Sequence, residues 1–317
     1  MSKPTTICAG IDTGKRKLDV ALEGGRERLE VDNNAAGHRA LADWLRGHRV
    51  KRVGIEASGG YEYPVVVELR RRGFVVIVFQ PAQVRAFAKF HLQRAKNDKI
   101  DAALIAMCTA GVKTIHAPPD SRLGPFAAHL TMLDQISDDV ARCKNRLESC
   151  RDPHTRRFWK EEIARFKKLY KIELKSLVAA IRQYRDLAER LDLINSVDGI
   201  GLITAVAILV RMPEIGRISR EQAAALAGVA PYDDDSGQLI GVRHIEGGRK
   251  RLRGALYCAA LPASQRWNPQ LIALYQRLRA AGKEHKRALI ACARKLLIFA
   301  NTVVARGTPW TARPNPA

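Results

Sequence analysis

The chain has 317 residues, 46% of them apolar, so it can build the cores of two ordinary domains and is not a disordered basic tail. Its 54 Lys and Arg residues outnumber its 32 Asp and Glu residues, and the formal charge of +22 indicates a polyanionic partner such as nucleic acid and argues against a small-molecule enzyme. The six cysteines include no Cys-x-x-Cys pair, which argues against a zinc site. Free thiols indicate a reducing cytoplasm. Neither a secretion signal nor a membrane span is expected.

The first 120 residues predict a mixed sheet covered by helices. Three short strands in succession, at 6–11, 18–22 and 28–31, are typical of an antiparallel meander. Two strand and helix steps follow, with helices at 36–48 and 63–72 and strands at 52–56 and 74–79. A further helix is expected at 98–109, and Pro118-Pro119 ends the domain. We therefore expect an α/β domain over residues 1–120.

Residues 121–191 show helical periodicity and no strand pattern. Apolar residues recur every three or four positions from Leu130 to Leu147 and from Ile163 to Tyr184, on either side of a break at Asp152-Pro153. This pattern predicts a helical hairpin or coiled-coil arm. Its charged faces suit a simple spacer, whereas its long apolar stripes favour a dimerisation arm that sets the distance between active sites.

Residues 192–307 are expected to form a compact, mostly α-helical domain, and the proline-containing residues 308–317 a disordered tail. The domain opens with Gly199-Ile200-Gly201 in front of an apolar helix at 202–211. Gly199 and Gly201 would expose backbone amide groups at a helix N-terminus, which suits a phosphate. The segment resembles the helix-hairpin-helix element that grips a DNA backbone without reading its sequence.

Four carboxylates form the main candidate site. Asp12 ends the first strand and Glu56 ends the strand at 52–56, and small residues follow both. Asp98 and Asp101 lie three residues apart at a helix start and therefore share one face. Four oxygen donors of this kind suit two Mg²⁺ ions about 4 Å apart, with Mn²⁺ as a substitute, in phosphodiester displacement.

Each carboxylate also has a structural interpretation, since Asp12 can begin a turn, Glu56 can be a surface acid and Asp98 can cap a helix. Their order along the chain resembles that of RuvC-type Holliday junction nucleases, which implies an RNase H-like (RuvC-like) fold for residues 1–120. Basic residues beside the last pair are expected to counter phosphate charge, namely Arg94, Lys96 and Lys99.

Ser236 is the second candidate, beside Gly237 in a polar loop that follows a helix and the turn at 227–231. From the residues alone it can equally be a loop or capping serine, because a nucleophilic serine needs a base or metal and none is adjacent in sequence. Basic residues that enter the next helix are expected to contact nucleic acid: Arg243, Arg249, Lys250, Arg251 and Arg253.

From residue 11 to residue 296 the chain resembles the insertion-sequence one-ten family of transposases, which includes Piv-like DNA invertases and bridge-RNA-guided recombinases. The resemblance implies that Asp12, Glu56, Asp98 and Asp101 bind metal, and that Ser236 joins covalently to DNA in a C-terminal transposase domain. It also implies a homo-oligomer, a dimer or tetramer, with active sites shared between subunits. A structured guide noncoding RNA would pair with donor and target DNA.

The sequence thus predicts a magnesium-dependent DNA recombinase in the bacterial cytoplasm, associated with the nucleoid when bound to DNA. Two other interpretations stay open. One is a junction-resolving nuclease in which water attacks and Ser236 is structural. The other is a basic RNA- or DNA-binding protein without catalysis.

Overall fold

The computed structural model describes residues 7–24, 27–92, 98–115, 120–233 and 243–311, and for residues 98–100 it describes the backbone alone. The chain divides into two compact units, residues 1–117 and 118–317. Each is described here by itself.

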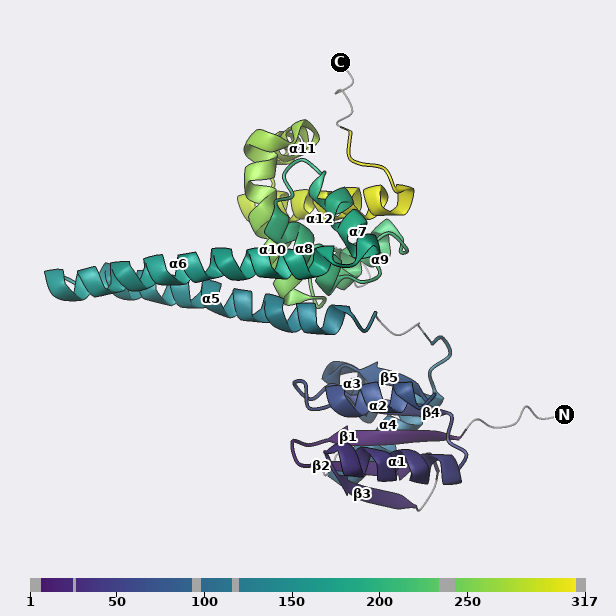
Figure 1. Cartoon of the computed structure of the whole chain (residues 1–317). Helices are drawn as coiled ribbons and strands as arrows, with labels where there is room; N and C mark the ends of the chain where they lie inside the picture. Colours follow the sequence, from purple (N-terminus) through teal and green to yellow (C-terminus); the bar gives the residue numbers. More distant parts are fainter. Residues whose placement is uncertain (1–6, 25–26, 93–97, 116–119, 234–242, 312–317) are drawn as a thin grey trace. The chain divides into compact units, whose positions relative to one another are not determined.

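The first unit is built on a mixed five-stranded sheet (Figure 1). Its strands are β1 (Cys8–Thr13), β2 (Lys17–Leu22), β3 (Arg28–Asp32), β4 (Arg52–Glu56) and β5 (Val75–Phe79). Their order is β3-β2-β1-β4-β5, with β1, β2 and β3 antiparallel and β1, β4 and β5 parallel. The expected meander followed by two strand and helix steps is confirmed, and so is the α/β fold class.

Helices cover both faces of this sheet. They are α1 (Ala35–Gly47), α2 (Tyr63–Arg71), α3 (Pro81–Phe90) and α4 (Asp98–Ala110). Leu41 and Leu45 of α1 share a buried core with Ile11 and Ile55, whereas α4 lies against the opposite face, over Gly10. Helix α3 was not among the predicted elements. It begins at a proline after Gln80, which forms a capping box with Gln83.

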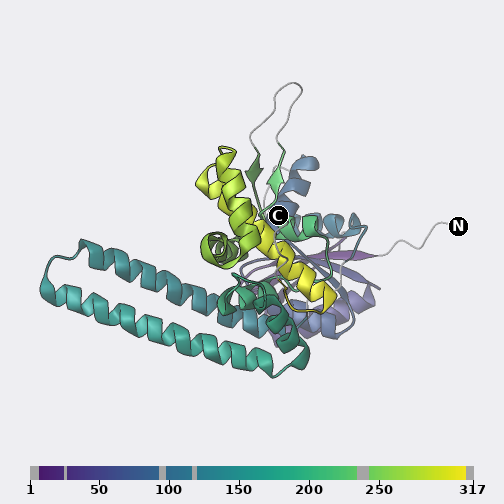
Figure 2. The same cartoon turned by 90° about the horizontal axis from the view of Figure 1, so that it is seen from above.

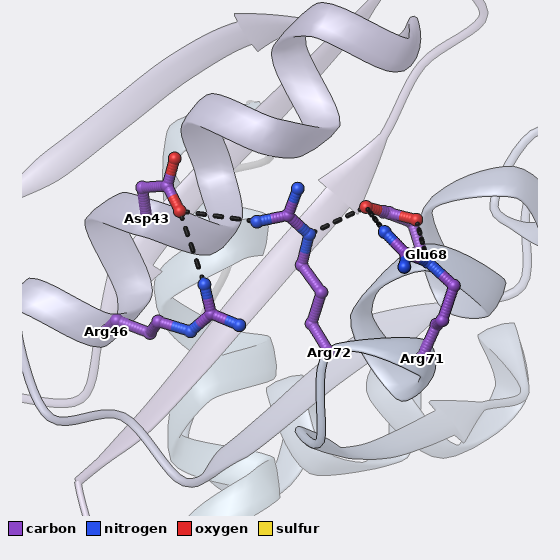
Figure 3. Close-up of polar contacts among 5 residues, drawn as sticks. All are labelled: Asp43, Arg46, Glu68, Arg71 and Arg72. Atoms are coloured by element: carbon purple, nitrogen blue, oxygen red, sulfur yellow. Dashed lines mark hydrogen bonds and ion pairs between the residues drawn. The ribbon is translucent and has the colours of Figure 1, made fainter.

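An ion-pair cluster joins α1 to α2 (Figure 3). The guanidinium of Arg72 donates to Asp43 on α1 over 3.3 Å and to Glu68 on α2 over 2.6 Å. Arg46 also contacts Asp43, and Arg71 makes two hydrogen bonds of 2.9 Å to Glu68. Hydrogen bonds from Arg71 and Arg72 lower the pKa of the Glu68 carboxyl to about 2. The cluster therefore holds the two helices together on the face away from α4.

The second unit begins with the helical arm. Its helices α5 (Leu123–Ser149) and α6 (Pro153–Arg182) form a hairpin, which Figure 2 shows as a long pair beside the other helices of the unit. The predicted break is confirmed, because Asp152 caps α6 by accepting the N–H of Thr155 over 2.8 Å and Pro153 occupies the first helical position.

The rest of this unit is a helical body. It comprises α7 (Arg185–Asn195), α8 (Leu202–Arg211), α9 (Arg220–Ala227), α10 (Lys250–Pro262), the π-helical turn η1 (Ala263–Trp267), α11 (Pro269–Ala280) and α12 (His285–Arg306). A two-stranded hairpin, β6 (Pro231–Tyr232) and β7 (His244–Ile245), was not predicted. Leu130 and Leu177 at the base of the arm belong to the same buried core as Leu256 and Leu296 of the body. The predicted succession of a helical arm and a mostly helical C-terminal region is therefore confirmed.

Helix α12 forms the centre of this body. Leu289, Ala293 and Leu296 lie on its buried side, and α7, α9, α10 and α11 pack against it. In the part of the chain that the structure describes, it is the one helix long and apolar enough to cross a membrane, and 56% of its most apolar window is buried inside the unit. Such burial is typical of a core helix.

Residues 308–311 correct the expectation of a disordered tail. The ring of Trp310 packs on Phe299, with ring centroids 4.3 Å apart, and the backbone N–H of Trp310 donates to the Ser196 hydroxyl over 2.8 Å. The prolines suggested disorder, but the apolar area that Trp310 buries holds the chain against the body. Residues 312–317 lie outside the described part.

Candidate functional site

Asp12 and Glu56 lie next to each other on the two central parallel strands. The register pairs Ile11 of β1 with Ile55 of β4, and each acid comes one residue later. Both side chains are half-buried. Since neighbouring strands lie about 4.8 Å apart, the sheet brings the two carboxylates to the same end of adjacent strands.

Two glycines decide which face of the sheet these carboxylates share. A Cβ atom on Gly10 would overlap the backbone of Ala102 and Ala106, and one on Gly54 would overlap the hydroxyl of Thr109. Helix α4 therefore packs directly on β1 and β4 at these positions. Side chains two residues apart on a strand point to the same face. Asp12 and Glu56 consequently lie on the face that α4 covers.

Asp98 and Asp101 lie in the first turn of α4, as predicted. Asp101 is half-buried and directly precedes Ala102, which contacts β1 at Gly10. The Asp98 side chain lies outside the described part of the structure. Among the side chains that are described, no three His, Cys, Asp or Glu groups come together closely enough to hold a metal ion. The complete four-carboxylate set is therefore still a prediction, although its hard oxygen donors are the chemistry that Mg²⁺ prefers.

Asp19 is an acidic neighbour that the sequence analysis missed. The antiparallel register places Asp19 of β2 directly opposite Asp12, and Glu30 of β3 opposite Asp19. Together with Glu56 they form a row of acids across four strands. Asp19 could have been found from the sequence, because β1 and β2 are joined by a tight turn at Gly14. Counting residue pairs outward from that turn places Asp19 opposite Asp12.

Several predicted residues lie outside the described part of the chain. These are Arg94 and Lys96, the side chain of Lys99, and Ser236. The flanks of the serine segment are described, and they pair as β6 and β7, with Tyr232 opposite His244. The residues on either side of the predicted loop therefore pair with each other.

The segment that resembles a helix-hairpin-helix element lies between α7 and α8, and Gly201 is the exposed N-cap of α8. Gly199 has a φ of +95°, and a Cβ atom there would collide with the side chain of Ala263. Packing against η1 is thus sufficient reason for a glycine at 199. A phosphate contact at Gly199 or Gly201 is still a prediction.

Three of the predicted nucleic-acid contacts also hold the body together. Arg249 makes a bidentate ion pair with Glu214, with distances of 2.8 and 2.6 Å. Arg251 donates to Asp134 of α5 over 2.8 Å, and Arg253 donates to the carbonyl of Gly247 over 2.6 Å. The other two residues of the set are Lys250, which is exposed in the first turn of α10, and Arg243, which is exposed and lies 2.5 Å from Asp233.

The mixed sheet, with acids on its two central parallel strands and a helical unit after it, defines a protein of the RNase H-like class. Comparison with family models agrees and is more specific. Residues 9–152 match a transposase model of the DEDD type, and residues 191–276 match the transposase IS116/IS110/IS902 family. The chain belongs to this IS110-type transposase family.

Individual proteins match over different spans. The chain is 26% identical to the pilin gene-inverting proteins of Moraxella bovis and Moraxella lacunata, over 96% of its own length and 97% of theirs. It is 30% identical to an insertion element IS110 protein of Streptomyces coelicolor over 38% of its length and 30% of that protein. Among solved structures, it is similar to Thermus thermophilus RuvC, with 22% identity, a TM-score of 0.24, and coverage of 36% of this chain and 84% of that one.

Proposed function

We propose that this protein is a DNA recombinase that cuts and rejoins the strands of a mobile element. The observation that carries the proposal is the position of Asp12 and Glu56, each one residue beyond the registered pair of Ile11 and Ile55, in a chain that matches both models of the transposase family. The excess of Lys and Arg, 54 against 32 acids, supports DNA as the substrate because phosphate is bound by positive charge.

The carboxylates of the first unit would bind Mg²⁺. Asp12, Glu56, Asp98 and Asp101 are the expected ligands, and their oxygen donors fit a hard cation. Such ions, when bound, stabilise the charge that develops on the attacking and leaving oxygens. Asp19 lies opposite Asp12 in the sheet, and its charge would strengthen the attraction for cations at this edge.

Ser236 is the proposed nucleophile. Its hydroxyl oxygen loses its proton and attacks the phosphorus of a phosphodiester, so that a serine–phosphate bond forms and the bond to one strand breaks. The released strand leaves with a protonated hydroxyl. A hydroxyl of the exchanged strand then attacks the same phosphorus, restores a phosphodiester and frees the serine. Support comes from the segment's place in a chain of this family, between β6 and β7.

A structured guide RNA and a homo-oligomer complete the proposal. The low aromatic content, 6%, favours contacts with a nucleic-acid backbone over base stacking, which leaves sequence recognition to base pairing. The arm has exposed apolar side chains that a second subunit could cover, including Phe158 and Ile172, both 51% exposed. The free thiols of Cys108, Cys143, Cys150, Cys258 and Cys292 fit a reducing cytoplasm.

Trapping the covalent intermediate tests this function. Wild-type protein, Ser236→Ala and the control Ser176→Ala, which alters an exposed serine on α6, are incubated with nicked element-end DNA and Mg²⁺ and then denatured. We expect DNA-linked protein from the wild type and the control, with the link mapped by mass spectrometry to Ser236. Ser236→Ala should bind DNA without forming the link. Cleavage without any link would indicate that water attacks, and binding without cleavage would indicate a non-catalytic protein.

A further inference from the structure

The second unit contains a basic cavity of about 730 Å³ at the base of the β6–β7 hairpin. The hairpin forms one wall, the end of α11 another, and the first half of α12 a third. Its charged and titratable lining residues are Arg243, His244, Lys283, Lys286, Arg287 and Arg294. Of these residues, Arg243 alone is among the predicted nucleic-acid contacts.

The described charged residues of the lining are all basic. Five lining residues are Lys or Arg, and none of the described lining residues is Asp or Glu. Two of the five have acidic neighbours, since Arg243 lies 2.5 Å from Asp233 and Arg287 lies 3.5 Å from Glu284. These pairs are at least half exposed, and exposed pairs contribute only about 0–1 kcal/mol. Lys286 and Arg294 have no carboxylate partner within the described residues. The cavity therefore lacks a negative charge that an anion would supply.

The helix geometry adds to this positive field. Lys286 and Arg287 lie in the first turn of α12, where the helix dipole is positive and basic side chains are unfavourable. Arg294 lies two turns further along the same face, and the core residues Leu289 and Leu296 lie on the other face. A phosphate group at this place would interact favourably with the helix N-terminus and with the side chains at once.

The floor of the cavity is apolar. Val229, Ile245, Leu278, Ile290 and Ala291 line it. A bare phosphate gains nothing from such a floor, whereas a nucleotide can place its sugar or base there while its phosphates contact the basic rim. The volume is that of a small-ligand pocket, within the range of roughly 300–1,000 Å³, and a space of this size suits an extruded nucleotide better than a duplex.

We propose that this cavity binds an unpaired segment of the DNA strand through two or more backbone phosphates. The proposal rests on the proposed function in one respect, because the hairpin that forms the wall leads into the loop of Ser236. DNA is thus the strand expected there. Apart from His244, the described lining residues include no aromatic ring on which a base could stack, so binding should depend little on base identity.

Fluorescence anisotropy with the full-length protein tests the proposal. The probes are a labelled oligothymidylate, an oligouridylate of equal length and a duplex. The cavity variant is Lys286→Gln with Arg294→Gln. The control variant, Lys171→Gln with Lys175→Gln, removes the same charge from exposed positions on α6. Thermal melting checks that both variants fold.

We expect the cavity variant to bind oligothymidylate about tenfold or more weakly, and to bind duplex about as well as the control does. Its plot of log affinity against log salt should become shallower by about 1.4, because each phosphate contact to a single strand contributes about 0.7 to the slope. Equal binding by the cavity and control variants would overturn the proposal. Equal losses for duplex and single strand would show a general charge effect, and a loss confined to oligouridylate would assign the cavity to RNA.

The trapping experiment keeps the two proposals apart. Ser236→Ala retains all of the cavity's lining residues, so it should bind oligothymidylate as the wild type does. If the wild type forms no covalent link but the cavity variant still loses oligothymidylate binding, the serine mechanism fails and the strand-binding cavity stands. If the link forms and binding is unchanged in the cavity variant, the cavity proposal alone fails.

Discussion

Asp12 and Glu56 occupy neighbouring positions on the parallel strands β1 and β4, one residue beyond the registered pair of Ile11 and Ile55. Their carboxylate oxygens are hard donors of the kind that Mg²⁺ and Mn²⁺ prefer. Their neighbour Asp19, opposite Asp12, increases the local negative charge. This edge of the sheet is therefore where we expect a divalent cation to bind.

Removing the charge of Glu56 should weaken cation binding. Glu56→Gln keeps the size of the side chain, so the fold should persist. The affinity for Mn²⁺, measured by calorimetry, should fall by roughly tenfold or more, because even the loss of an outer-shell partner of a metal ligand costs about that much. Asp32→Asn is the matched control, because Asp32 is an exposed acid on the edge strand β3. Equal affinities for Glu56→Gln and wild type would remove Glu56 from the metal site.

The close approach of α4 to β1 should make Gly10 intolerant of a side chain. In Gly10→Ala the new methyl group would overlap the backbone of α4, which must then shift together with Asp101. Overpacking of this kind costs about 1–3 kcal/mol or more, so the melting temperature of the first unit should fall. Gly47→Ala is the control, since a Cβ atom there meets nothing within 4 Å. If both variants melt alike, α4 does not pack on β1 as described.

Acid should weaken the Glu68 cluster within a defined pH range. The pKa of Glu68 falls from 4.5 to about 2 because Arg71 and Arg72 donate hydrogen bonds to its carboxylate. Its contribution to stability is therefore present above pH 4.5 and is lost as the pH falls through about 2. Glu68→Gln should melt lower than wild type at neutral pH, and the difference should shrink across that range. The exposed acid Glu23 provides the control variant Glu23→Gln, and a pH-independent difference would contradict the assignment.

The arm should mediate self-association through its exposed apolar side chains. Phe158, 51% exposed near the start of α6, is the largest candidate contact, and burial of such a ring contributes about 1.5–3 kcal/mol. Phe158→Ser should lower the mass that light scattering measures at a fixed concentration, whereas Lys160→Ser should leave it unchanged. A monomeric wild type, or an oligomer that Phe158→Ser does not affect, would make the arm a spacer.

The elements with strong local patterns could be predicted from the sequence. The short apolar runs of β1 to β5, bounded by turns, and the three- and four-residue spacing around Asp152-Pro153 are local signals, and the structure confirms the elements that they predict. The missed elements have two different causes. Helix α3 has local start signals, a proline at its first position and the capping box of Gln80 and Gln83, so it could have been predicted. The two-residue strands β6 and β7 are too short to show a period.

The same distinction explains the candidate site. Asp12 and Glu56 could be found because each ends a strand, but their adjacency required the parallel pairing of β1 with β4. The grouping of Lys286 and Arg294 with Arg243 across α12 and the hairpin could not be inferred from spacing alone. Arg249 shows a structural role that the sequence did not reveal, because its partner Glu214 lies 35 residues away along the chain, and its predicted contact with nucleic acid stays a prediction.

The most direct test of the account is recombination between two element-end DNAs, supplied with Mg²⁺ and the element's own transcript. Four samples are compared: wild-type protein, Asp12→Asn, Ser236→Ala, and an equimolar mixture of the two variants. We expect product from the wild type, none from either variant alone although both bind DNA, and partial recovery in the mixture, because an active site shared between subunits would pair an intact serine with an intact carboxylate set. Wild-type levels of product from Asp12→Asn or from Ser236→Ala alone would contradict the account.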